Sequence, residues 1–131
     1  MQTNPKYDDL IKEIILFFAK KLQVAKQVGI NDVIIDPGFG FGKTIEHNYQ
    51  ILNELEKFNI LDCPILIGMS RKSMIYKVLG SEPKDVLPAS LALNMVALQK
   101  GSSILRVHDV KETVQIVKVF NKLLNVSKNK S

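Results

Sequence analysis

Three short stretches of the sequence combine charged or hydroxyl side chains with glycines in a way that is typical of anion sites. The first is Asp36 and the loop 37–44, whose three alternating glycines permit unusual backbone angles and a close approach of a ligand. The second is the Ser-Arg-Lys-Ser segment 70–73, and the third is the Arg-Val-His-Asp segment 106–109. Lysine, arginine and histidine near hydroxyl groups predict binding of a phosphate or carboxylate.

The glycine loop differs from two known phosphate-binding motifs by one residue each. A nucleoside-triphosphate loop requires glycine where Pro37 stands, and a dinucleotide fingerprint requires it where Lys43 stands. A nucleotide site is therefore disfavoured. Asp36 remains open between a turn or cap residue and a ligand acceptor, whereas Thr44 is expected to cap the next helix and His47 to be solvated.

The segment 70–73 predicts an anion site at a helix start. Ser70 fits an N-cap, which places Arg71 and Lys72 in the first helical turn, where cations oppose the helix dipole. A bound anion, held also by free backbone N–H groups and the Ser73 hydroxyl, would explain that arrangement. A surface salt bridge is the alternative, and it is the preferred interpretation for Arg71.

The third segment predicts a clamp for a diphosphate. Strand alternation places Arg106 and His108 on one face, with Val107 pointing away, and two donors on one face suit a diphosphate. A packed, hydrogen-bonded role for His108 stays open. Asp109 and Glu112 fit a capping box, so we interpret Asp109 as structural.

Apolar runs that alternate with helical patterns indicate an α/β fold with a parallel sheet. The predicted strands are 33–36, 64–68 and 103–107; the predicted helices are 4–29, 46–58, 70–79, 88–100 and 110–124. The spacing of the strand ends is close to the about 31 residues per unit of an eight-unit βα barrel. Three strands cannot close such a barrel. We therefore expect the chain to be part of a larger barrel or to assemble with itself.

Composition limits the possible functions. The 131 residues are 46% hydrophobic with a net charge of +5, which excludes disorder and predicts one partial domain over residues 1–131, with a frayed tail at 125–131. The basic residues are not interleaved with aromatics, so no nucleic-acid partner is expected. No apolar run is long enough for a membrane span and no signal segment precedes the first helix, so we expect the cytoplasm. Cys63, alone, is expected to be a small buried hydrophobe.

The three motifs, in this order and spacing, resemble those of dihydropteroate synthases over essentially the whole chain. The resemblance implies a partial (β/α)8 TIM barrel that contains the last three βα units preceded by a helix. Residues 1–5 resemble an internal segment after the fifth strand of that barrel, which leaves open whether Met1 is the natural start.

The family joins p-aminobenzoate to 6-hydroxymethyl-7,8-dihydropterin diphosphate, which gives 7,8-dihydropteroate and diphosphate in folate biosynthesis. The resemblance implies substrate binding by Asp36, Phe41, Gly68, Lys72, Ser73, Arg106 and His108. In this assignment Asp36 accepts hydrogen bonds from the pterin, and Lys72 contacts the pterin and orients p-aminobenzoate. Ser73 binds the carboxylate of p-aminobenzoate while Phe41 packs on its ring.

For the leaving group, the resemblance implies that Arg106 and His108 hold the diphosphate as its charge grows. No side-chain nucleophile is expected. The family also uses Mg²⁺, whose ligand belongs to the other half of the barrel, so no metal ligand is expected here. The isolated chain is expected to have little or no synthase activity, and a homodimer through the last helices stays open.

The alternative is a non-catalytic half-barrel that binds a pterin or another anion, or that complements a second chain. Corrinoid-dependent pterin methyltransferases share the barrel, but we do not expect them to present segment 70–73 as an anion site.

Overall fold

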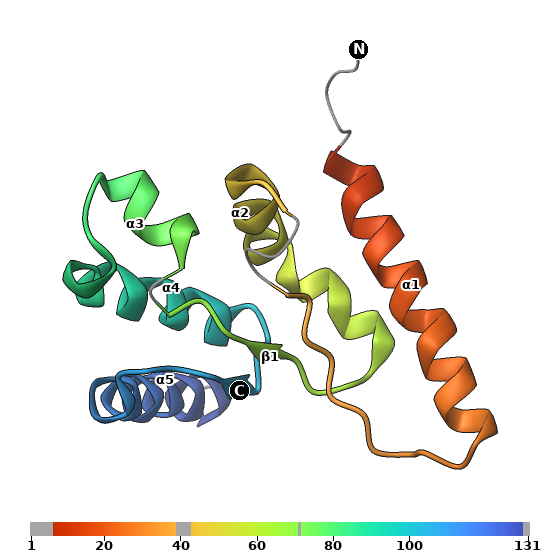
Figure 1. The fold of residues 1–131 in the computed structure, drawn as a ribbon. Coiled ribbons are helices and arrows are strands. Elements are labelled where there is room, and N and C mark those ends of the chain that lie inside the picture. The colour runs from red at the N-terminus through yellow and green to blue at the C-terminus, as the bar shows by residue number, and fades with distance from the viewer. Residues whose placement is uncertain (1–6, 39–42, 71, 130–131) are drawn as a thin grey trace.

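The computed structural model of the chain describes residues 7–38, 43–70 and 72–129. Helices surround short central strands (Figure 1). The elements in chain order are α1 (Tyr7–Gln27), α2 (Ile45–Asn53), the 3₁₀ helix η1 (Leu55–Leu61), β1 (Leu66–Ile67), α3 (Ser73–Leu79), the 3₁₀ helix η2 (Pro83–Asp85), α4 (Leu87–Gln99), β2 (Ile104–Leu105) and α5 (Val110–Asn129).

The strands are parallel and follow each other in chain order. β1 pairs with β2 in the register Leu66 to Ile104, and on the other side Ile35 forms a parallel bridge with Ile65. The backbone N–H of Ile35 donates to Pro64 over 2.9 Å. Helices separate these segments along the chain, which confirms the predicted α/β class with a parallel sheet. The ladders are shorter than the predicted strands because the segments at 35 and 104 each have one strand neighbour in the described part of the chain.

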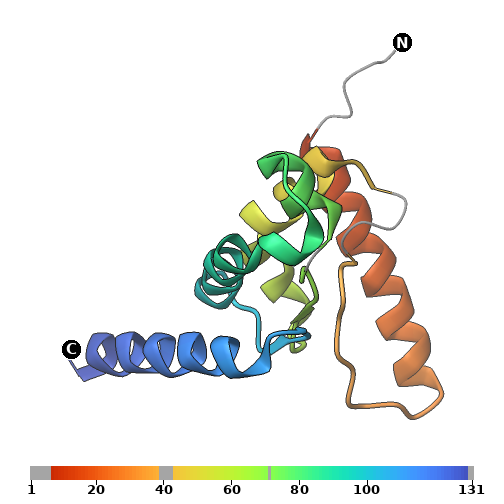
Figure 2. The same cartoon turned by 60° about the vertical axis from the view of Figure 1, so that its left-hand side comes forward.

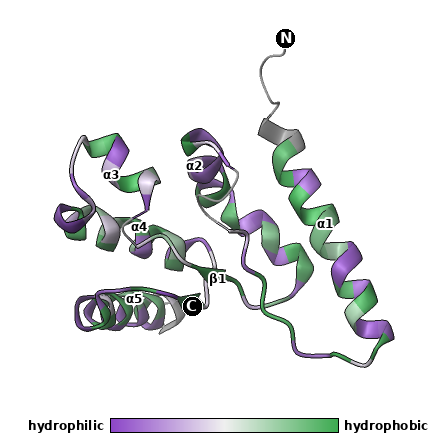
Figure 3. Ribbon diagram, viewed as in Figure 1, coloured by the Kyte–Doolittle hydropathy of each residue, from purple (hydrophilic) through white to green (hydrophobic). Residues whose placement is uncertain are grey.

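The core lies between α1, α2, η1, β1 and α3. Its most completely buried members come from the apolar positions of these elements: Ile51, Leu55, Phe58, Ile65, Ile67, Met69 and Met74. Phe18 of α1 covers Phe58 edge to face, with ring centroids 6.5 Å apart. In Figure 3 the apolar residues of α1 form a band along the helix, as the helical spacing of its sequence predicts.

Several predicted helix boundaries are confirmed. The Thr44 hydroxyl accepts a hydrogen bond from the His47 N–H over 3.0 Å, and the Thr44 N–H donates to His47 Nδ1, which completes a capping box. Gly29 and Gly101 follow α1 and α4 with φ values of +88° and +110°.

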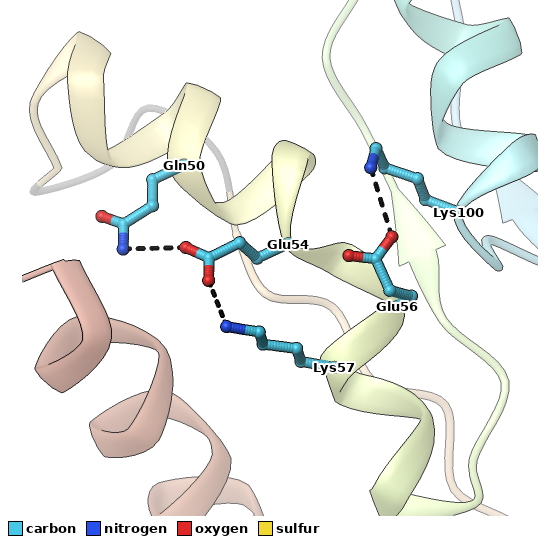
Figure 4. Close-up of polar contacts among 5 residues, drawn as sticks. All are labelled: Gln50, Glu54, Glu56, Lys57 and Lys100. Atoms are coloured by element: carbon cyan, nitrogen blue, oxygen red, sulfur yellow. Dashed lines mark hydrogen bonds and ion pairs between the residues drawn. The ribbon is translucent and has the colours of Figure 1, made fainter.

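The predicted helix 46–58 is divided in two, and a polar network surrounds the division (Figure 4). Glu54 lies between α2 and η1; its carboxylate accepts a hydrogen bond of 3.0 Å from Gln50 and forms an ion pair with Lys57. Lys100, just after α4, forms a 3.2 Å ion pair with Glu56 of η1. These contacts fasten η1 to its neighbours on both sides.

The C-terminal helix is longer than predicted. α5 continues to Asn129, and no proline or glycine interrupts residues 125–129. The helix packs mainly on α4 and extends away from the other elements (Figure 2). Apolar side chains on it stay exposed, including Val110 (61%) and Leu123 (54%).

Two other expectations of burial need correction. Ile34, in a strand predicted to be buried, is 54% exposed because one face of that segment has no covering element in the described structure. Cys63 is only half-buried, and its thiol donates to the Leu61 carbonyl oxygen over 3.4 Å. None of the described helices combines the length and apolar character that a membrane crossing demands.

Candidate anion-binding site

The site lies at the edge of the sheet where the three strand segments end. Asp36 follows the bridge at Ile35, Gly68 follows β1, and Arg106 follows β2. Because the carboxyl ends of parallel strands meet at one edge, residues far apart in the sequence come together there. Arg106 Nη1 lies 3.4 Å from Asp36 Oδ2, which joins the two outer segments across β1.

The Asp36 carboxylate is held by its own loop as well as by Arg106. Its Oδ1 accepts a hydrogen bond of 2.8 Å from the Gly38 N–H, and Gly38 has a φ of +74° that glycine adopts without strain. This local bond fixes the carboxylate at the strand end. The geometry is therefore compatible with both roles that the sequence left open for Asp36, a turn residue and a ligand acceptor. Asp36 lies in a turn, and its carboxylate oxygens lie at the open edge of the sheet.

Gly68 is required by the close approach of Arg106. A Cβ atom at position 68 would lie 2.7 Å from Arg106 Nη2 and 3.0 Å from Cζ. The guanidinium therefore lies directly over the buried backbone of Gly68. The Arg106 side chain remains 59% exposed, so its other donors face solvent and are available to an anion.

A pocket of about 130 Å³ opens beside this pair. Its lining consists of Gly68, Ser70, Lys72, Arg106, Val107 and His108. Val107, which strand alternation was expected to turn away, contributes to the lining because β2 ends at Leu105 and alternation does not continue beyond it. Arg106 and His108 do share this pocket, as expected.

Lys72 contributes a cation whose charge is destabilised by its surroundings. Partial burial lowers the pKa of its ammonium below the ordinary 10.5, repulsion from Arg106 lowers it further, and attraction to Asp36 opposes both effects. The pocket therefore gathers two cationic side chains and a histidine at one point. An anion bound there would relieve the repulsion between Lys72 and Arg106.

The predicted helix start at Ser70 is wrong. α3 begins at Ser73 with Lys72 as its N-cap, and Lys72 makes no side-chain capping bond. The Ser70 hydroxyl instead accepts a 3.4 Å hydrogen bond from the His108 N–H, which ties the loop after β1 to the loop after β2. The cation at position 72 thus precedes the helix, and the argument from an unfavourable helix dipole does not apply.

Ser70 is the lining residue that the sequence reasoning misassigned. A serine three residues before a helix matches a cap by type, and only the pairing of two distant loops shows that it has another partner. Ser73 is half-buried in the first turn of α3, outside the lining of the pocket. Phe41 lies outside the described residues, as does Arg71.

The site suits binding and charge stabilisation. Its donors can hold a multiply charged anion, and the Asp36 carboxylate can accept hydrogen bonds from a polar ligand beside it. The described residues include no cluster of three or more histidine, cysteine or carboxylate side chains that could hold a metal ion.

Comparison with known proteins gives one consistent family. The sequence model of the family described as "Pterin binding enzyme" matches residues 1–108. The chain is 44% identical to the dihydropteroate synthase of Escherichia coli K12 over 99% of this chain and 47% of the relative. It is 41% identical to the Haemophilus influenzae enzyme over 95% of this chain and 46% of that protein.

Solved structures agree with the sequence relatives. The 7,8-dihydropteroate synthase of Vibrio fischeri matches with a TM-score of 0.86 at 50% identity, over 95% of this chain and 47% of that one. The Xanthomonas albilineans enzyme, solved in complex with 7,8-dihydropteroate, matches with a TM-score of 0.85 at 37% identity, over 95% and 50% of the two chains. The chain thus spans about half the length of the relatives it matches.

Proposed function

Because the chain belongs to the pterin-binding enzyme family, we propose that it forms the last three βα units of a dihydropteroate synthase barrel and half of the active site. The observation that carries this proposal is the meeting of Asp36, Lys72 and Arg106 at the carboxyl ends of three parallel strand segments. The proposed reaction joins p-aminobenzoate to 6-hydroxymethyl-7,8-dihydropterin diphosphate and releases diphosphate. Relatives named dihydropteroate synthase match nearly the whole of this chain.

The Asp36 carboxylate would receive the amino-pyrimidine edge of the pterin. Its Oδ1 accepts one bond from the Gly38 N–H and its Oδ2 accepts one from Arg106, so each oxygen keeps one further acceptor position for a ligand. Lys72 would contact the pterin and orient p-aminobenzoate. Ser73, one residue further along, would bind the carboxylate of p-aminobenzoate, and Phe41 is proposed to pack on its ring.

Arg106 and His108 would bind the diphosphate over Gly68. In the reaction the bond between the pterin methylene carbon and the diphosphate oxygen breaks, and the electron pair leaves with the diphosphate. The amine nitrogen of p-aminobenzoate then bonds to that carbon and loses a proton. Negative charge grows on the diphosphate as it leaves, and fixed cations stabilise such a transition state more than the ground state.

No side-chain nucleophile takes part in this proposal, since the departure of diphosphate leaves an electrophilic methylene that the amine attacks directly. Mg²⁺, a cytoplasmic location and a homodimer remain proposals that come from the family.

We expect the 131-residue chain to bind the diphosphate substrate but not to complete turnover without the rest of a barrel. Calorimetry with the pterin diphosphate measures binding, and release of diphosphate in the presence of p-aminobenzoate measures turnover. Arg106→Gln should abolish binding, whereas Lys100→Gln, on the remote Glu56 ion pair, should leave it unchanged. Steady turnover that Lys72→Ala abolishes would contradict the proposed inactivity, and absence of binding would contradict the assignment of the site.

A non-catalytic half-barrel that binds a pterin or another anion is the second candidate. It is favoured by the exposed edge at Ile34. Addition of a separately expressed N-terminal half of a relative distinguishes the two, because a complementing piece gains turnover and a pure binding module does not.

A further inference from the structure

A tyrosine of α2 is hydrogen-bonded to the backbone of the helix that follows the anion pocket. The Tyr49 hydroxyl donates to the Met74 carbonyl oxygen over 2.7 Å. Tyr49 is half-buried, and Met74 lies in the first turn of α3. The bond therefore joins two helices whose sequences are separated by β1 and the loop after it.

α3 depends on its neighbours for its position. It has only seven residues, too few for a stable isolated helix, and no side chain caps its start. The buried side chains of Met74 and Ile75 attach it to the core, but apolar contacts are non-directional. A hydrogen bond to its backbone is directional, so the Tyr49 contact restricts how the helix can rotate or slide.

α2 can hold α3 in place through this hydrogen bond, because both the start of α2 and its inner face are fixed. The capping box at Thr44 and His47 defines its first turn. Ile51 and Leu52 are 0% and 3% exposed in the core.

The backbone of Lys72 moves with the first turn of α3. Its carbonyl oxygen accepts hydrogen bonds from the N–H groups of Ile75 (2.9 Å) and Tyr76 (3.3 Å). A displacement of the first turn would therefore displace Lys72 relative to Arg106, which is carried by the separate strand β2.

We propose that Tyr49 is a positioning residue, whose hydroxyl acts through the Met74 carbonyl to set the place of Lys72 in the anion pocket. The proposal rests on the proposed function only for the identity of the ligand. Tyr49 touches neither the pocket nor the ligand; its effect is on the distance between Lys72 and the charges that face it.

The test is the titration of the Lys72 ammonium, followed by NMR of its side-chain carbon in the 131-residue chain without ligand. Among the described residues, the groups that face Lys72 include Arg106, Asp36 and His108. In Tyr49→Phe we expect the pKa of Lys72 to rise toward the ordinary lysine value, because the amine becomes more hydrated and moves away from Arg106. Burial raises the pKa of the Tyr49 hydroxyl, which favours its protonated, donating form.

Tyr76→Phe is the matched control, because it removes a tyrosine hydroxyl from α3 itself and leaves the bond between Tyr49 and Met74 in place. The Lys72 titration should be unchanged in this variant. Replacing Tyr49 by p-aminophenylalanine keeps a donor in place and should restore the wild-type titration. All variants are measured in sucrose, which favours the folded chain, so that reduced stability does not obscure the result.

An unchanged Lys72 titration in folded Tyr49→Phe, or an equal shift in Tyr76→Phe, overturns the proposal. Affinity for p-aminobenzoate with the pterin site filled is measured separately, and Tyr49→Phe should weaken it about two- to tenfold, the range for one net hydrogen bond. If the wild-type chain binds neither substrate, the proposed function fails, while the ligand-free titration still decides the role of Tyr49.

Discussion

Gly68 is the residue at which the smallest change should have the most direct effect on the anion pocket. In Gly68→Ala the new methyl group would lie 2.7 Å from Arg106 Nη2, so the guanidinium has to leave the backbone and its contact with Asp36. We expect the affinity for inorganic diphosphate to fall about tenfold by calorimetry, as for loss of a charged hydrogen bond. The fold should persist, since Arg106 moves into solvent; unchanged affinity would show that Arg106 binds from another position.

Lys72 should show opposite effects on binding and on stability. Because its pKa is lowered in the folded chain, its charge destabilises the fold at all pH values below that pKa, and this cost disappears as the pH rises to 10.5. Lys72→Gln should therefore leave the free energy of unfolding at pH 7 unchanged or raise it by up to about 0.5 kcal/mol, while it weakens diphosphate binding. Urea denaturation and calorimetry measure the two effects. A clear loss of stability would mean that the lysine is structural.

The residues of the pocket were partly predictable from the sequence. Asp36, Lys72 and Arg106 could be placed at one edge because each follows an apolar run, and strand ends gather in parallel sheets. Ser70 could not be assigned correctly, since its partner is a backbone group 38 residues away. The roles of Ser73 and Phe41 stay predictions.

The start of η1 contains an acid-sensitive contact. The ion pair with Lys57 holds the pKa of Glu54 below its ordinary 4.5, with a smaller contribution from Gln50 and partial opposition from burial. The stabilisation is thus present above pH 4.5 and is lost as the pH falls through the folded pKa. Glu54→Gln should cost about 0.5 kcal/mol at pH 7, and the difference should vanish in strong acid, as measured by urea denaturation at each pH.

Glu82→Gln, which makes the same change of side chain at an exposed position, serves as the control for this prediction. If Glu54→Gln matches the unaltered chain at neutral pH, the ion pair contributes nothing to folding.

Element types were more predictable than their boundaries. The five helical regions were identified from the sequence. Helical spacing of apolar residues indicated the first of them, because amphipathic spacing reflects which face is buried. The division of the helix at Glu54 and the start of α3 at Ser73 depend on contacts with other elements. The predicted strands reduce to one or two paired residues because pairing requires a neighbour, and a sequence pattern does not say whether one is present.

At the scale of the whole molecule, we argued from the sequence that three strands cannot close a barrel. Two uncovered surfaces of the structure agree with this argument. A groove of about 720 Å³ lies between α4, β2 and α5, and its lining includes Leu105, Val114 and Phe120. At the opposite edge Ile34 is exposed. Three strands were predicted from the apolar runs, and the described residues form two strands and one isolated bridge at Ile35. The sequence pattern does not say what packs on the uncovered surfaces.

The attachment of α5 chiefly to α4 has a consequence for the order in which the molecule opens. A helix that can detach without disturbing the core exchanges its amide hydrogens through local opening, at a free energy well below that of global unfolding. We expect α5 amides to exchange much faster than those of Leu66 and Ile67 in hydrogen-exchange mass spectrometry or NMR. Equal protection would show that the helix unfolds together with the sheet; fast exchange would make α5 the first cooperative unit to be lost.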